Sequence, residues 1–164
     1  MFSYIFAIIS GIVILAVDQY TKYYISDNFI LGESSDFLKG FIDITYIHNR
    51  GGAWGMLSGY TWILFSATII IMLVCIAMLL KVGIKNELMF WAITLVMAGG
   101  LGNLIDRIFR DGNVVDFLHF EFYPSFPVFN IADCSIVVGA GLIILYFLIE
   151  TINEYKTAKK NSAV

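Results

Sequence analysis

Two aspartates, Asp116 and Asp133, lie in apolar surroundings on either side of an aromatic segment. If residues 117–129 loop out and return, the two carboxyl groups come together. Neighbouring carboxylates cannot both ionise cheaply, so the pKa of one rises and the pair shares a proton. One acid can then act as a general base on water while the other donates a proton to a peptide carbonyl. The alternative interpretation makes both acids helix caps or salt-bridge partners, with Asp133 a first-turn acid favoured by the helix dipole.

Further polar residues stand beside the ends of apolar runs. Asn130 precedes Asp133 by one helical turn and could orient its carboxylate. Near the end of the third run, Asn103 shares a helix face with Asp106 and Arg107. Asp106 and Arg107 are sequence neighbours that do not face each other, so each needs a partner from another element. Such a cluster is either structural or part of a functional site.

Asp18 and Lys22, after the first apolar run, have the spacing of an ion pair on one helix face. A catalytic lysine would instead need a nucleophilic hydroxyl beside it, and Thr21 points elsewhere on the helix. Asn49 and Gly51 belong to a glycine-rich segment, which is either a flexible loop or a loop that contacts a substrate.

The cysteines and histidines indicate no further chemistry. Cys75 and Cys134 have the surroundings of small apolar residues in packed helices, and no disulfide framework or metal-ligand spacing is present. His48 and His119 are single and are expected to be interfacial aromatic residues with one hydrogen bond each. We therefore expect no metal and no cofactor.

Composition decides the environment of these residues. The chain has 164 residues, of which 59% are hydrophobic and 14% charged, and its mean hydropathy is +0.82. Such values are typical of an integral membrane protein. A helix that crosses the bilayer needs about 20 residues. Four apolar runs are present, at 4–17, 61–80, 88–102 and 134–149. Only 61–80 reaches that length, so the other three carry polar neighbours to membrane depth or into the interface.

These runs predict a membrane α-helical fold of one domain. The four transmembrane helices are expected at about 4–25, 61–81, 88–108 and 131–151. Residues 27–60 and 109–130 then lie on one side of the membrane, and both termini, including the tail 152–164, lie on the other. Alternation in 41–49 predicts a strand, and hence a small β-rich subdomain between helices 1 and 2 at the membrane surface.

The distribution of positive charge does not orient these helices by itself. Five lysines and arginines fall on each side of the predicted topology. We favour cytoplasmic termini, because lysine is the only basic residue type in the tail and in the loop 81–87. Several of the basic residues on the other side belong to polar motifs.

Four blocks of this sequence resemble the lipoprotein signal peptidases, also called signal peptidase II. They are DQYTK (18–22), HNRGGAWG (48–55), GNLIDRIFRDGNVVDF (102–117) and FNIAD (129–133). The resemblance implies a four-helix aspartyl peptidase of the bacterial cytoplasmic membrane, with cytoplasmic termini and an active site near the extracytoplasmic surface. Its substrates would be prolipoproteins, cut before a diacylglyceryl-modified cysteine.

The resemblance also implies roles for individual residues. Asp116 and Asp133 fall on the catalytic pair. The residues that fall on substrate-binding positions, or on positions that support the pair, are Asn49, Gly51, Asn103, Arg107 and Asn130. Those that fall on positions of structural support are Asp18, Lys22 and Asp106. Two departures, Gly52 and Cys134, leave both acids in place but could alter substrate or inhibitor preference.

Expected partners are prolipoproteins and membrane lipids, with no nucleic acid, and the protein is expected to be a monomer. Segments 51–59 and 121–129 are candidates for a mobile lid. The rival hypothesis is a small transporter or ion pathway. Against it, the polar residues gather at helix ends on one side, and 61–80 contains no ionisable residue.

Overall fold

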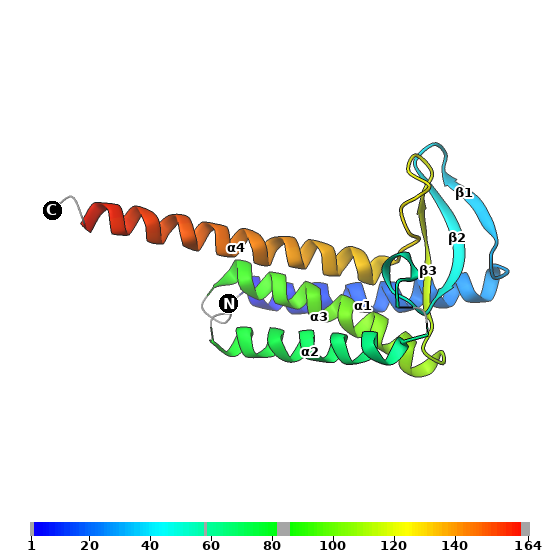
Figure 1. Ribbon diagram of the computed structural model, residues 1–164, viewed down its shortest axis with the longest axis horizontal. Helices are drawn as coiled ribbons and strands as arrows, with labels where there is room; N and C mark the ends of the chain where they lie inside the picture. Colours follow the sequence, from blue (N-terminus) through cyan, green and yellow to red (C-terminus); the bar gives the residue numbers. More distant parts are fainter. Residues whose placement is uncertain (1, 58, 82–85, 162–164) are drawn as a thin grey trace.

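A computed structural model describes residues 2–57, 59–81 and 86–161 (Figure 1). Four helices, long and apolar enough to cross a membrane, account for most of the chain. They are α1 (Phe2–Asn28), α2 (Thr61–Lys81), α3 (Glu87–Phe109) and α4 (Ile131–Asn161). The smaller elements are strands β1 (Ser34–Leu38), β2 (Ile42–Asn49) and β3 (Val114–Phe120) and the 3-10 turn η1 (Ala53–Gly55).

Helix α3 is the centre of the bundle, because α1, α2 and α4 all pack against it. Glycines allow α3 and α4 to approach each other closely. A Cβ atom at Gly99 would lie 2.3 Å from the carbonyl oxygen of Ala132, and one at Gly139 would lie 2.7 Å from that of Ala92. Small residues at these positions bring helix backbones together, as the sequence predicts. The end of α3 is thereby held against the start of α4.

The outer helices present apolar side chains outward. In α2 the buried residue is Cys75, and most of the large exposed hydrophobic side chains of the described chain belong to α1, α2 and α4. A soluble protein would not expose so much apolar surface. Their exposure fits helices surrounded by lipid.

The three strands form an antiparallel sheet in the order β1-β2-β3, across one end of the bundle (Figure 1). The predicted strand 41–49 is confirmed as β2. The third strand was not predicted, and it comes from between α3 and α4 rather than from between helices 1 and 2. Its first four residues are all buried, so β3 lacks the alternation that reveals a strand with one exposed face.

An apolar cluster attaches the sheet to the bundle. It joins the last turn of α1 to β2 and β3 through Ile25, Tyr46, Val115 and Phe117. Successive strand residues point to opposite faces. Because Val115 and Phe117 pack toward α1, Asp116 between them faces the other way.

Helix bounds differ from expectation mainly at the termini. Helix α1 ends at Asn28, and α4 continues to Asn161, well beyond the predicted end at 151. Residues 151–161 are exposed and polar but rich in good helix formers, so hydropathy locates the membrane span and not the end of the helix. Residues 82–85 of the predicted short loop, residue 58 of the glycine-rich segment and residues 162–164 of the tail lie outside the described residues.

Candidate active site

A cavity of about 260 Å³ lies where the sheet meets α3 and α4. Its polar lining side chains come from β2, α3, β3 and α4, and are Asn49, Asn103, Arg107, Asp116 and Asp133. Residues 126–129, with Ile136 and Val137, form an apolar wall. The structure thus brings the two aspartates singled out by the sequence into one cavity. They are the only carboxylates among its lining residues in the described chain.

Asp116 is almost completely buried, with 1% of its surface exposed. Its Oδ2 accepts a hydrogen bond from Asn49 Nδ2 at 2.7 Å, and its Oδ1 accepts one from Asn130 Nδ2 at 2.6 Å. Burial, and then the nearby charge of Asp133, raise the pKa of Asp116 to about 7, although both amide hydrogen bonds oppose the shift. At neutral pH this carboxyl group can therefore hold or release a proton.

Asp133 occupies the first turn of α4 and takes part in a reciprocal helix cap. Its backbone N–H donates to Asn130 Oδ1 at 2.9 Å, and its Oδ2 accepts from the backbone N–H of Asn130 at 3.1 Å. The other oxygen, Oδ1, accepts from Asn103 Nδ2 at 2.8 Å. The interpretation of Asp133 as a first-turn helix cap is confirmed, and the same cap fixes the carboxylate that lines the cavity.

Asn130 connects the two acids. It is completely buried, and besides capping α4 with Asp133 it donates from Nδ2 to Asp116. The same Nδ2 lies 3.1 Å from Asn103 Oδ1 and 3.4 Å from the carbonyl oxygen of Val115. One amide thereby fixes the relative positions of the two carboxylates.

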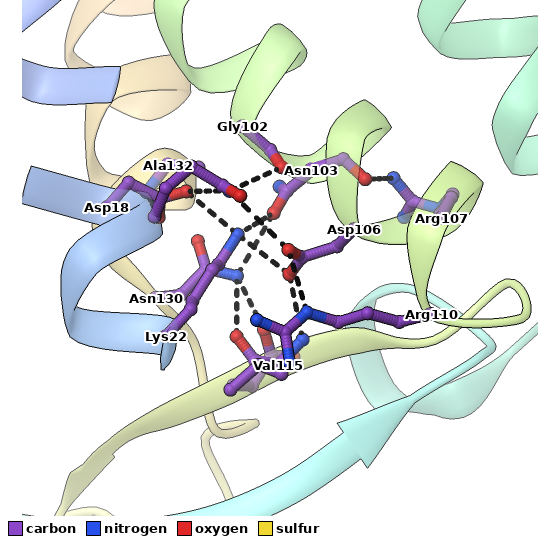
Figure 2. A network of polar contacts seen from close by, with 12 residues as sticks. Asp18, Lys22, Gly102, Asn103, Asp106, Arg107, Arg110, Val115, Asn130 and Ala132 are labelled. Carbon is purple, nitrogen blue, oxygen red and sulfur yellow. Dashed lines mark hydrogen bonds and ion pairs between the residues drawn. The ribbon is translucent and has the colours of Figure 1, made fainter. Parts of the chain in front are cut away.

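A buried ionic network lies behind these amides (Figure 2). Lys22 Nζ lies 3.0 Å from Asp18 Oδ2 and 3.1 Å from Asp106 Oδ2, and it donates to Asn103 Oδ1 at 2.9 Å. The side chains of Lys22, Asp18 and Asp106 are all at most 1% exposed. Thr21 bonds the carbonyl oxygens of Val17 and Asp18, so it offers Lys22 no nucleophile. Lys22 therefore has a structural position, and its charge orients the amide of Asn103.

The network also holds the two elements that carry the acids (Figure 2). Asp106 Oδ2 accepts from the backbone N–H of Val115 at 3.0 Å, which anchors β3 next to Asp116. Asp18 Oδ1 accepts from the backbone N–H of Ala132 at 2.9 Å, which anchors the first turn of α4 next to Asp133. Removing one partner of a buried ionic cluster leaves an uncompensated charge and is costly, so these anchors stabilise the positions of both elements.

Arg107 and Gly51 have different surroundings from those residues. Arg107 lines the cavity, and within the described part of the chain it donates only to the carbonyl oxygen of Asn103 in its own helix, at 3.3 Å. Its Nε is buried without a hydrogen-bond partner among the described residues. Gly51 does not line the cavity, whereas its neighbour Gly52 does. The N–H of Gly51 donates to Asn49 Oδ1 at 2.9 Å, which leaves the Asn49 amide nitrogen directed at Asp116.

Sequence reasoning missed three polar residues around this site. Gln19 Nε2 donates to the carbonyl oxygen of Gly102 at 3.1 Å. Arg110 Nε lies 3.3 Å from Asp106 Oδ1, and Asn113 Oδ1 accepts from Arg50 Nε at 2.9 Å. The partners of Gln19 and Asn113 depend on how the helices and the sheet pack. Arg110 stands four residues after Asp106 at the end of α3, a spacing from which the sequence could have predicted this ion pair.

The two predicted lid segments contact each other beside the cavity. The Trp54 indole N–H donates to the carbonyl oxygen of Ser125 at 3.2 Å, and its ring packs edge-on against Phe126. Trp54 has φ +54°, an uncommon value for a residue other than glycine. The histidines lie nearby, each with one hydrogen bond as expected, His48 to Tyr46 and His119 to the carbonyl oxygen of Pro124. Motion of these segments stays a prediction.

Comparison with known proteins identifies the family. The family model described as signal peptidase (SPase) II matches residues 10–149. The chain belongs to the signal peptidase II family. A lipoprotein signal peptidase of Bacillus pumilus is 40% identical over 151 residues, covering 92% of this chain and 94% of the relative. A lipoprotein signal peptidase of Desulfitobacterium hafniense is 41% identical over 145 residues, covering 88% of this chain and 94% of the relative.

Solved structures agree with this membership in the signal peptidase II family. One bacterial membrane enzyme matches with a TM-score of 0.81 at 39% identity, covering 90% of each chain. Another gives a TM-score of 0.78 at 40% identity, covering 87% of this chain and 92% of its own. The predicted fold class and the predicted aspartic endopeptidase class are confirmed, and the protein is a multi-pass bacterial membrane enzyme.

Proposed function

We propose that this enzyme removes the signal peptide from prolipoproteins, cutting immediately before a diacylglyceryl-modified cysteine, with Asp116 and Asp133 as its catalytic pair. The observation that carries the proposal is the cavity in which both acids are held by the amides of Asn49, Asn103 and Asn130. The names of the relatives supply the substrate class.

The proposed reaction needs one proton shared between the two acids. Asp116, whose pKa is raised to about 7, can hold that proton at neutral pH and donates it to the oxygen of the scissile carbonyl. Asp133 accepts a proton from the attacking water, whose oxygen bonds to the carbonyl carbon. When the tetrahedral intermediate collapses, the C–N bond breaks, the leaving amine takes the proton from Asp133, and a hydroxyl proton of the intermediate passes to Asp116 as the new carbonyl group forms. The pair then returns to its singly protonated state.

Arg107 is proposed to position the substrate. Its guanidinium lines the cavity with a buried Nε that has no partner in the described protein, so a backbone carbonyl oxygen of a bound peptide would satisfy it. The apolar wall, 126–129 with Ile136 and Val137, would face the residues next to the scissile bond. We propose that the enzyme acts as a monomer surrounded by membrane lipid, since every group in this scheme comes from one chain.

The test is hydrolysis of a purified diacylglyceryl prolipoprotein in detergent or vesicles. We expect Asp116→Asn and Asp133→Asn each to lower the rate by a factor on the order of 10³ or more. Asp111→Asn is the matched control. Asp111 is exposed in the turn between α3 and β3 and has φ +52°, a conformation that asparagine tolerates.

Substantial turnover by either variant, in protein whose thermal unfolding is unchanged, would contradict the catalytic pair. A chelator should leave the wild-type rate unchanged. A loss of activity on chelation that added zinc restores would also contradict the catalytic pair.

A further inference from the structure

A second cavity of about 380 Å³ shares a wall with the catalytic cavity. We call it the outer cavity. One side is lined by Phe120, Phe126 and Phe129. The other side is the outward face of α4, with Cys134, Val137 and Val138. Asp133, Phe126, Phe129 and Val137 line both cavities. The two cavities are therefore neighbours on opposite sides of a single layer of side chains.

The outer cavity opens toward the bilayer. Val137 is 70% exposed and Val138 is 55% exposed on a helix that crosses the membrane, so this face meets lipid. The opposite side is a packed aromatic wall, because the ring of Phe120 has its centroid 5.0 Å from that of Phe129 and 5.3 Å from that of Phe126. No side chain of the described residues fills the space between them.

The position of the scissile bond determines what can enter. This step rests on the proposed function, in which the bond cut lies directly before a lipidated cysteine. The lipid is then joined to the residue next to the carbonyl that Asp116 and Asp133 act on, and it must leave the polar cavity within a few covalent bonds. The outer cavity begins at Asp133, is apolar and is open to the membrane.

We infer that the outer cavity binds one acyl chain of the substrate's diacylglyceryl group, and that Cys134, Val137 and Val138 determine which chains fit. An acyl chain is surrounded by hydrocarbon both before and after it enters, so the hydrophobic effect contributes little. Binding of the acyl chain instead favours the reaction by orientation, because a bound chain fixes the lipidated cysteine relative to the two carboxylates.

Another apolar cavity provides a built-in comparison. It measures about 450 Å³, lies between α1 and α3, and shares no lining residue with the catalytic cavity. Ile12 lines it and is 63% exposed, close to the exposure of Val138. A bulky side chain at Ile12 therefore reproduces the size and lipid exposure of a change at Val138 without touching the outer cavity.

The first experiment measures kcat/KM for synthetic peptides carrying a cysteine with two hexadecanoyl or two hexanoyl chains. We expect Val138→Trp to lower kcat/KM about tenfold for the long-chain peptide and less than twofold for the short-chain peptide. Ile12→Trp should change neither. Equal losses on both peptides, or no loss on either, would overturn the assignment. Failure of the wild type to cut either peptide would instead contradict the proposed function.

The second experiment locates the chain without relying on turnover. The Asp116→Asn variant is mixed with a lipopeptide that carries a photoreactive diazirine midway along one acyl chain, and the cross-linked fragment is identified by mass spectrometry. We expect labelling within 134–138. Labelling confined to the α1–α3 cavity, or spread evenly over the lipid-facing helices, would overturn the proposal.

Discussion

Asp116 is a carboxyl group whose ionisation is coupled to its surroundings. Its pKa of about 7 in the folded protein exceeds the ordinary value of about 3.9 for aspartate, because burial and the charge of Asp133 disfavour its ionised form. The folded state therefore holds a proton that the unfolded chain has already released. Its contribution to stability is fully present below about pH 4 and is lost as the pH rises toward 7.

This linkage predicts a pH dependence of both stability and rate. Between pH 5 and pH 8 the unfolding temperature of the wild type should fall more than that of Asp116→Asn, which has no carboxyl group to ionise at this position. The cleavage rate should decline above about pH 7, where Asp116 loses the shared proton. Calorimetry and a pH–rate profile in the same detergent measure the two effects. Parallel unfolding curves for the two proteins would contradict the raised pKa.

A second prediction concerns the single residue Lys22. Lys22→Met removes the one cation that bridges Asp18 and Asp106, and it leaves two buried carboxylates facing each other. We expect a loss of about 3–5 kcal/mol in the free energy of unfolding. Lys39→Met, at an exposed turn, should change little. Adding Asp106→Asn to Lys22→Met should recover part of the loss, whereas no recovery would show that the carboxylate pair is not its source.

The sequence indicates which residues matter more readily than how they are connected. Asp116 and Asp133 are conspicuous because acids in apolar surroundings are costly. The ion pair between Asp106 and Lys22 joins two helices, so it can be recognised only once α1 is seen to pack against α3. The same packing brings Gln19 to Gly102, a contact that no sequence spacing reveals.

At the scale of elements, the active site depends on the approach of α3 to α4. Gly99 has no room for a Cβ atom beside the carbonyl oxygen of Ala132, which lies in the first turn of α4 next to Asp133. One turn further along α3, Asn103 donates to Asp133. Separating the helices here would therefore lengthen a bond to a proposed catalytic carboxylate.

We predict that Gly99→Ala destabilises the protein by about 1–3 kcal/mol and lowers kcat on the order of 10²-fold through displacement of Asp133. Gly141→Ala is the matched control, because nothing lies within 4 Å of a Cβ atom built at Gly141. Unfolding in detergent and single-turnover cleavage measure the two effects. Full activity of Gly99→Ala would show that the separation between α3 and α4 does not position the acid.

Elements are predictable where a single physical requirement dominates. The bilayer imposes length and apolarity, so all four helices are evident in the sequence. Strand β3 obeys no such requirement, because its first four residues are all buried and its neighbours β2 and α1 are distant in sequence. The register that sets Ile47 opposite Asp116 comes from tertiary pairing.

At the scale of the whole molecule, the distribution of polar groups fits a peptidase and not an ion path. Among the described residues, the buried charged side chains are Asp18, Lys22, Asp106 and Asp116. All four belong to one network at the sheet end of the bundle, which Asp116 joins through Asn130 and Asn103. A conducting path would need ionisable groups at several depths. The start of α1 and the end of α4 lie at the opposite end (Figure 1).

The same distribution explains why counting positive charges fails to orient the chain. On the sheet side, Lys22 and Arg110 are held by Asp106, and Arg50 is bonded to Asn113. Their positions serve the site, so they are poor indicators of topology. On the terminal side, Lys81, Lys156 and Lys160 are exposed at or beyond the ends of membrane spans, where the positive-inside rule applies. We therefore propose cytoplasmic termini and an extracytoplasmic sheet.

Labelling with a membrane-impermeant maleimide tests this orientation. In a background with Cys75→Ala and Cys134→Ser, Ser35→Cys on the exposed strand β1 should react in intact cells. Asn161→Cys at the end of α4 should react only after the membrane is permeabilised. The reverse pattern would place the acids on the cytoplasmic side, where an exported prolipoprotein does not present its cleavage site. Reaction of both cysteines in intact cells would mean that the termini and the sheet are not separated by the membrane.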